Sequence, residues 1–132
     1  MKKILLLLLL AGCQKPEIPP APACNPTGSY TFSHVATATH PDTPVELTGL
    51  AVPLIQMLQA FLGTQVVIEG NFIRLSNHVR RVDTYGSSPT HTELVDTGGS
   101  LFFVTCSSSG KRLRIPAVVG LSTLQLIYTG TP

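Results

Sequence analysis

The amino-acid sequence predicts a mainly β domain, either a small antiparallel β-barrel or a β-sandwich of seven or eight strands, with one apolar helix inserted at 51–62. Short stretches rich in Thr, β-branched and aromatic residues recur from residue 27 to 132, separated by turn-forming Gly, Pro, Ser and Asn. Such stretches are typical of strands. A barrel or double sheet buries one face of each strand without leaving long unpaired edges. With 132 residues, 43% hydrophobic and 12% charged, the chain fits one globular domain.

The first predicted strand covers residues 29–38, where Tyr30, Phe32 and His34 share one face by the two-residue period. Residues 40–44 contain two prolines and predict a turn, because proline breaks a strand ladder. Helical spacing then replaces the strand period at 51–62, and Gly63 supplies a C-terminal stop. The residues at helical spacing are Leu54, Leu58, Phe61 and Leu62.

The helix needs a cover, since its only polar side chains are two glutamines. It either seals one end of the sheet as a core helix or borders an opening that a lipid or a partner segment enters. We favour the second interpretation because the chain carries signs of membrane attachment, given below.

The remaining strands are predicted from apolar stretches between turn signals. Pro116 should end the penultimate strand or mark a sheet edge. In the final strand, Leu124, Leu126 and Tyr128 should share one face. These strands are expected at 65–68, 72–75, 78–85, 90–97, 100–106, 111–115 and 121–129.

The N-terminus has the layout of an export signal. Lys2 and Lys3 precede an unbroken apolar run at 4–10, which is shorter than the roughly 20 residues that span a bilayer. The sequence Leu-Ala-Gly-Cys at 10–13 resembles the lipobox of bacterial prolipoproteins. That resemblance implies removal of residues 1–12, lipidation of Cys13, and attachment to the cell envelope. Gln14 follows at the position where, in the lipoproteins of enteric bacteria, an aspartate causes retention in the inner membrane, so the same resemblance implies the outer membrane, with the domain facing the periplasm.

Residues 13–26 form the predicted tether. The segment is rich in proline, which favours an extended polyproline II spacer of about 3.1 Å per residue. Removing Lys2 and Lys3 lowers the formal net charge from +2 to zero. Without a basic stripe or a recognisable motif, we expect no nucleic-acid partner. The pairs Arg80-Arg81 and Lys111-Arg112 are interpreted as solvated hairpin charges.

Lipidation of Cys13 would leave Cys24 and Cys106 as an even pair in an oxidising compartment, which predicts a disulfide between them. Two free buried thiols are the alternative, and a catalytic cysteine is disfavoured because no family signature surrounds either residue. Gly28-Ser29-Tyr30 resembles the Gly-x-aromatic start of lipocalin-like barrels. The helix after the first strand departs from the order of that family.

Catalytic motifs such as GxSxG, HExxH, CxxC and Gly-rich phosphate loops do not occur, and His34, His40, His78 and His91 lack metal-ligand spacing. We therefore expect that the chain is not an enzyme and that it binds no metal or cofactor. The favoured function is binding of a small apolar ligand or lipid. The alternatives are a pilotin-like assembly factor that holds a polypeptide, or an inhibitor of a secreted enzyme. The predicted ligand-binding residues are Tyr30, Phe32, Leu54, Leu58, Phe61, Phe102 and Phe103.

Overall fold

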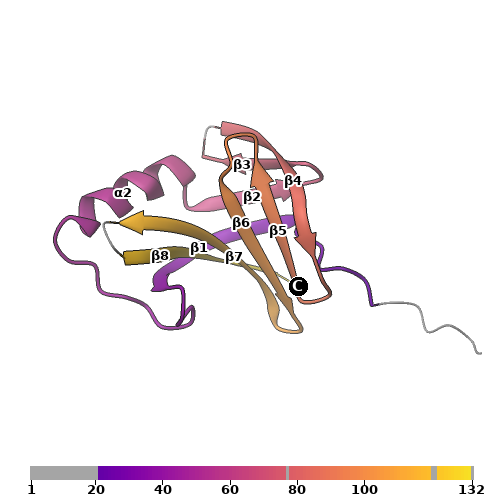
Figure 1. Cartoon of the computed structure of the whole chain (residues 1–132), viewed down its shortest axis with the longest axis horizontal. Coiled ribbons are helices and arrows are strands. Elements are labelled where there is room, and N and C mark those ends of the chain that lie inside the picture. Colours follow the sequence, from indigo (N-terminus) through magenta and orange to yellow (C-terminus); the bar gives the residue numbers. More distant parts are fainter. Residues whose placement is uncertain (1–20, 77, 120–121, 132) are drawn as a thin grey trace, which may run out of the picture.

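The computed structural model describes residues 21–76, 78–119 and 122–131, which form a closed antiparallel barrel with its strands in sequence order (Figure 1). The predicted mainly β class is confirmed, and of the two predicted architectures the structure has the barrel. Helix α2 occupies Ala51–Leu62, the range predicted for it. The strands are β1 (Gly28–Thr37), β2 (Gln65–Glu69), β3 (Phe72–Leu75), β4 (His78–Ser87), β5 (His91–Asp96), β6 (Leu101–Ser107), β7 (Gly110–Val119) and β8 (Ser122–Gly130).

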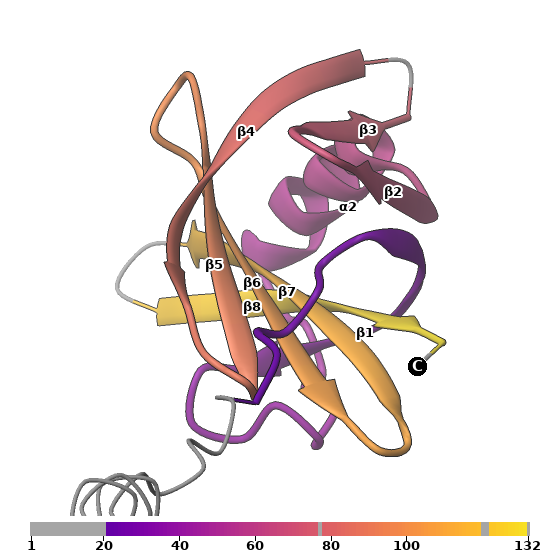
Figure 2. The same ribbon diagram turned by 90° about the vertical axis from the view of Figure 1, so that its right-hand side faces the viewer.

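The barrel closes where β1 pairs with β8, the strand farthest from it in the sequence (Figure 2). The register runs from Tyr30 opposite Gly130 to Thr37 opposite Leu124. Tyr30 and Tyr128 are both fully buried, and the ring of Phe32 meets that of Tyr128 edge-on at 5.4 Å. The closing pair is therefore both a hydrogen-bonded ladder and part of the hydrophobic core.

A register shift between Phe32 and His34 reverses which side chains of β1 face inward. Phe32 packs against the core before the shift, and Val35 joins the core after it. The extra residue of a β-bulge changes the parity of the strand. The prediction that His34 shares the face of Tyr30 is therefore wrong, and His34 Nε2 instead lies 2.7 Å from the carbonyl oxygen of Pro41.

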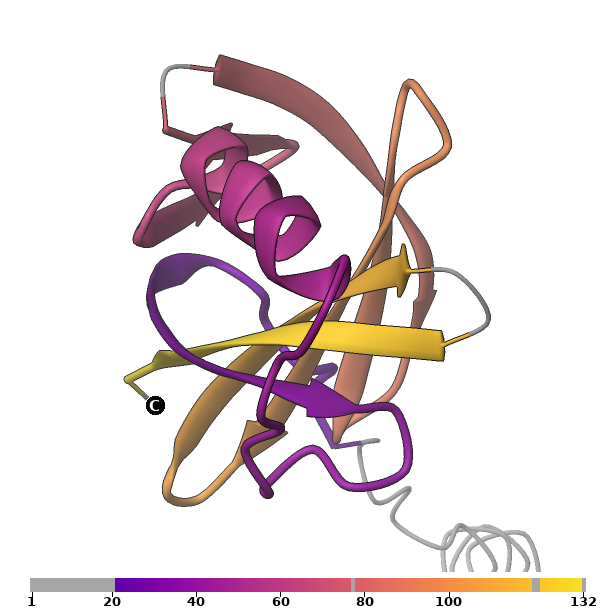
Figure 3. The ribbon, with the colours of Figure 1, turned by 90° about the vertical axis from the view of Figure 1, so that its left-hand side faces the viewer.

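Helix α2 lies across one end of the barrel, whereas the segment before β1 lies at the other end (Figures 1 and 3). Gly63 ends the helix with a positive φ of 85°, and its N–H donates to Gln59 O at 2.8 Å. The hydroxyl of Tyr128 donates to Gly63 O at 2.8 Å, which ties this helix end to β8. Among the described helices, none is long and apolar enough to cross a membrane.

The predicted disulfide between Cys24 and Cys106 is confirmed. It fastens the segment that precedes β1 to the end of β6. Two further bonds hold Cys24 in place: its N–H donates to Ser88 O at 2.8 Å, and its carbonyl oxygen accepts from Thr92 Oγ1 at 2.6 Å. Cys24 is only 4% exposed, so this segment belongs to the folded domain although the sequence places it in the tether.

Replacing both cysteines of this disulfide by serine should lower the free energy of unfolding by about 4 kcal/mol, because the bridge closes a long loop and so reduces the conformational entropy of the unfolded chain. Urea denaturation of wild type and Cys24→Ser/Cys106→Ser measures the difference. A reductant should lower the stability of wild type to a similar extent and leave the double variant unchanged. Equal stability of oxidised and reduced wild type would contradict the expectation.

Candidate functional site

Helix α2 presents apolar side chains on two opposite faces. Ile55 and Leu62 are buried in the barrel core, and Leu58 packs against it. Leu54 and Met57 point outward and are 45% and 66% exposed. Leu54, Leu58, Phe61 and Leu62, the residues at helical spacing, are divided between the two faces, because a helix that is apolar all round has no periodicity that identifies its inner side.

Two hollows flank this helix. The first, which we call the mouth cavity, has a volume of about 300 Å³ and lies between the C-terminal half of α2, the β5–β6 turn and β7. It is lined by Leu58, Phe61, Leu62, Leu75, Arg80, Gly99, Ser100, Leu101, Phe102, Ile115 and Pro116. The second, the outer groove, has a volume of about 500 Å³ and is lined by Leu54, Ile55, Met57, Leu58, Phe61, Pro116, Ala117 and Val118. Leu58, Phe61 and Pro116 line both, so the two hollows are adjacent.

Pro116 explains why the sheet opens at this point. The β6–β7 ladder ends at Phe103 and Arg114, although β7 continues beside β8 as far as Val119. By the alternation of an antiparallel ladder, Pro116 would be the next residue of β7 to donate toward β6, and proline has no N–H to donate. The expected strand end at Pro116 is thus wrong, but the expected edge exists on the β6 side.

A partly buried ion pair between Arg80 and Asp96 borders the mouth cavity. Asp96 Oδ1 accepts the N–H groups of Gly98 and Ser100 at 2.9 and 2.8 Å, and Oδ2 accepts from Arg80 Nη1 at 2.9 Å. Burial raises the pKa of Asp96, but the hydrogen bonds and the Arg80 charge outweigh it, so the pKa lies below its ordinary value of 3.8. The Arg80 guanidinium also lies 5.3 Å from the centre of the Phe61 ring.

The structure brings together four of the seven predicted ligand-binding residues: Leu54, Leu58, Phe61 and Phe102. Tyr30 and Phe32 instead pack in the barrel core, where the Tyr30 hydroxyl donates to Pro26 O at 2.6 Å. Phe103 lies on the outer face below Arg114, 5.7 Å from its guanidinium carbon. Neighbouring residues of a strand point to opposite faces, so Phe102 and Phe103 could not both face inward.

Sequence reasoning missed Arg80 and Asp96 as parts of the site. Arg80 was expected to be a solvated hairpin charge, yet its side chain is 38% exposed and the Asp96 side chain is fully buried. The available signal was strand alternation: Arg80 lies two residues before the core residue Val82, and Asp96 two residues after the core residue Leu94. A charged residue at an inward position indicates a partner or a site.

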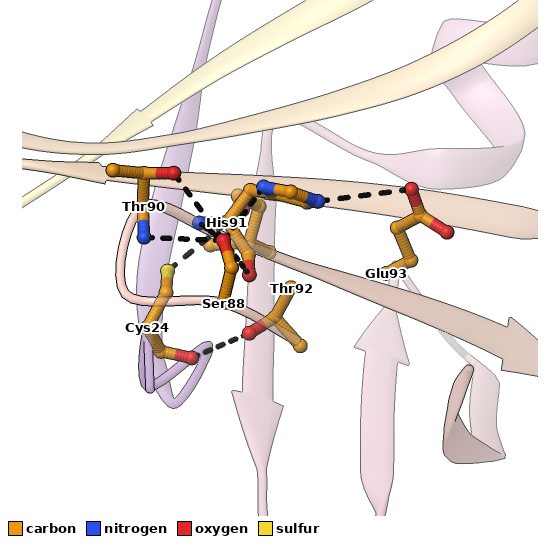
Figure 4. Close-up of polar contacts among 7 residues, drawn as sticks. Cys24, Ser88, Thr90, His91, Thr92 and Glu93 are labelled. Atoms are coloured by element: carbon orange, nitrogen blue, oxygen red, sulfur yellow. Dashed lines mark hydrogen bonds and ion pairs between the residues drawn. The ribbon is translucent and has the colours of Figure 1, made fainter. Parts of the chain in front are cut away.

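Ser88, His91 and Glu93 form a serine–histidine–acid cluster at the end of the barrel that holds Cys24 (Figure 4). Ser88 Oγ lies 2.9 Å from His91 Nδ1, and His91 Nε2 lies 3.9 Å from Glu93 Oε1. Ser88 Oγ also accepts the N–H groups of Thr90 and His91 at 3.3 and 3.2 Å. Its lone pairs are therefore engaged in the turn, and the cluster stabilises the β4–β5 connection on which Cys24 rests.

Within the described ranges, no three His, Cys, Asp or Glu side chains gather closely enough to hold a metal ion. Comparison of the chain with protein-family models, curated proteins and solved structures finds no match. The candidate site therefore has to be interpreted from its own geometry, which is an apolar hollow with one ion pair at its wall.

Replacing Asp96 by Asn should lower the free energy of unfolding at pH 7 by roughly 2 kcal/mol, because a charge-assisted hydrogen bond to Arg80 is lost. The lowered pKa means that Asp96 stabilises the fold above pH 3.8 and that this contribution disappears as pH falls through the folded-state value. Denaturant unfolding at pH 7 and at acidic pH should show the two proteins converging on acidification. Asp83→Asn, at an exposed position, is the control and should change the free energy of unfolding little. A difference between wild type and Asp96→Asn that does not depend on pH would contradict the expectation.

Proposed function

We propose that this chain is a non-enzymatic, lipid-anchored envelope lipoprotein that binds a small apolar ligand or lipid in the mouth cavity and outer groove. The observation that carries the proposal is the apolar surface left uncovered along α2. Met57 is 66% exposed, and Val118, across the outer groove on β7, is 75% exposed. Exposed apolar area costs about 25 cal/mol per Å², so a ligand that covers this surface gains that free energy.

The dimensions and lining of the hollows fit this role. Cavity volumes of about 300 and 500 Å³ lie in the range of small-molecule sites. Their walls are mainly aliphatic and aromatic, with few polar groups. Such a lining suits an apolar chain better than a sugar or a nucleotide, which would leave its polar groups without hydrogen-bond partners.

The N-terminal signals support the envelope part of the proposal. Cys13 and the lipobox lie outside the described residues, as does most of the tether. Several acyl chains on one cysteine make attachment to a membrane effectively stable, and a membrane is a source of apolar ligands. The outer membrane, with the domain facing the periplasm, remains our proposed location.

A pilotin-like role is the second candidate, because Leu50, which directly precedes α2, and the outward residues of α2 form a row suited to another helix. Leu50, Leu54, Met57 and Phe61 follow one another at spacings of three and four residues, and all four are exposed. An apolar helix of a partner polypeptide would cover this row. The enzyme-inhibitor hypothesis receives no comparable support from the described part of the chain.

Polar substitutions in the outer groove should weaken binding of a neutral apolar dye such as N-phenyl-1-naphthylamine. We expect Leu54→Gln/Met57→Gln to raise the dissociation constant roughly thirtyfold, since the two lost apolar contacts contribute about 1 kcal/mol each. Dye fluorescence measures binding, and thermal unfolding checks that the fold survives. Tyr85→Ser removes an exposed aromatic ring outside both hollows and should leave binding unchanged. Absence of dye binding to wild type, or equal loss in Tyr85→Ser, would refute the site.

Mass spectrometry of the membrane fraction should find the mature chain beginning at an acylated Cys13. Cys13→Ser should abolish acylation and leave residues 1–12 uncleaved, because the thiol is the lipid acceptor that the lipobox resemblance implies. An unmodified Cys13 in the membrane-bound protein, or cleavage at another residue, would overturn this part of the proposal.

A further inference from the structure

We infer that the mouth cavity selects a single-chain amphiphile with a carboxylate head, such as a long-chain fatty acid, and that Arg80 is the partner of that head. The inference rests on the proposed function and names the class of ligand. Its starting point is the charge of the site: among the described residues that line either hollow, Arg80 is the one charged side chain.

The guanidinium of Arg80 has N–H donors available for a ligand. It carries five N–H groups, and the structure gives it one hydrogen bond, from Nη1 to Asp96 Oδ2. The side chain lines the mouth cavity and is 38% exposed. A carboxylate entering from the cavity side would find N–H groups in the planar arrangement that favours two parallel hydrogen bonds.

Asp96 positions Arg80 but does not fully neutralise the positive charge of the guanidinium. The carboxylate of Asp96 is held by the backbone N–H groups of Gly98 and Ser100, whose dipoles stabilise part of its negative charge. Phe61 contacts the guanidinium through its ring face. Because these contacts fix the guanidinium before a ligand arrives, less conformational entropy is lost on binding.

The path from Arg80 into the outer groove suits one aliphatic chain. Phe61, Leu58 and Pro116 line both hollows, so the mouth cavity and the outer groove are direct neighbours and an aliphatic chain has only these three side chains to pass. From there the groove extends beside Leu54 and Val118. A head at Arg80 thus places the first part of the chain in the mouth cavity and the rest along α2.

The test compares two ligands of equal chain length, laurate and 1-dodecanol, as competitors for bound N-phenyl-1-naphthylamine at neutral pH. On wild type we expect laurate to displace the dye at a concentration roughly tenfold lower than 1-dodecanol, in line with one charge-assisted hydrogen-bonded contact. Arg80→Gln/Asp96→Asn should remove the preference without leaving a buried unpaired carboxylate. Arg81→Gln removes a positive charge at the next, exposed residue, as Arg80→Gln does within the double variant, and should retain the preference.

Each outcome decides between the hypotheses. A laurate preference that is lost in Arg80→Gln/Asp96→Asn and kept in Arg81→Gln supports the inference. Equal displacement by both ligands on wild type overturns it while leaving the proposed function intact. A preference that persists in the double variant also overturns it, because the head is then bound elsewhere. Failure of wild type to bind the dye or either competitor overturns both proposals. Circular dichroism of each variant confirms that the comparison is made between folded proteins.

Discussion

The pairing of β1 with β8 is the constraint on which the rest of the structure depends. It joins the two ends of the folded chain, removes the two edges that an open eight-stranded sheet would expose, and surrounds the core with strands. Tyr30, Phe32 and Tyr128 fill the space that this closure creates. Once the wall is closed, the apolar α2 has only an end of the barrel to cover, which places it where the hollows lie.

The sequence was sufficient to predict the strands and the helix, because turn residues separate them and the two periodicities differ. It was insufficient where one extra residue changes which side chains of a strand face inward, and where the partner of a side chain lies on another element. The register shift after Phe32 turns His34 outward, which strand alternation alone does not reveal. The adjacent Phe102 and Phe103 gave no local indication of which ring faces the core. Likewise, Leu54 and Phe61 differ from Leu58 and Leu62 only in what lies opposite them in space.

The candidate site was predicted in part, since its apolar residues come from a conspicuous helix and its ion pair does not. Arg80 and Asp96 come from different strands and meet only through the β4–β5 pairing. Pro116 shows how a local property of one residue, its missing N–H, affects the whole fold. The missing N–H limits the β6–β7 ladder, and the hollow occupies the place where further pairing would have joined the strands.

The position of the disulfide determines how a mechanical load would travel through the molecule. Cys24, at the start of the folded domain, is bonded to Cys106, so a force applied through the preceding segment enters the barrel at β6 rather than peeling away β1. The residues between the two cysteines form a covalent ring that pulling does not lengthen. Of the residues from Cys24 onward, only those after Cys106 can be pulled out, and residues 107–132 have a contour length of about 90 Å at roughly 3.5 Å per residue. A domain tied to an envelope in this way would keep six of its eight strands within the ring while its last two strands yield.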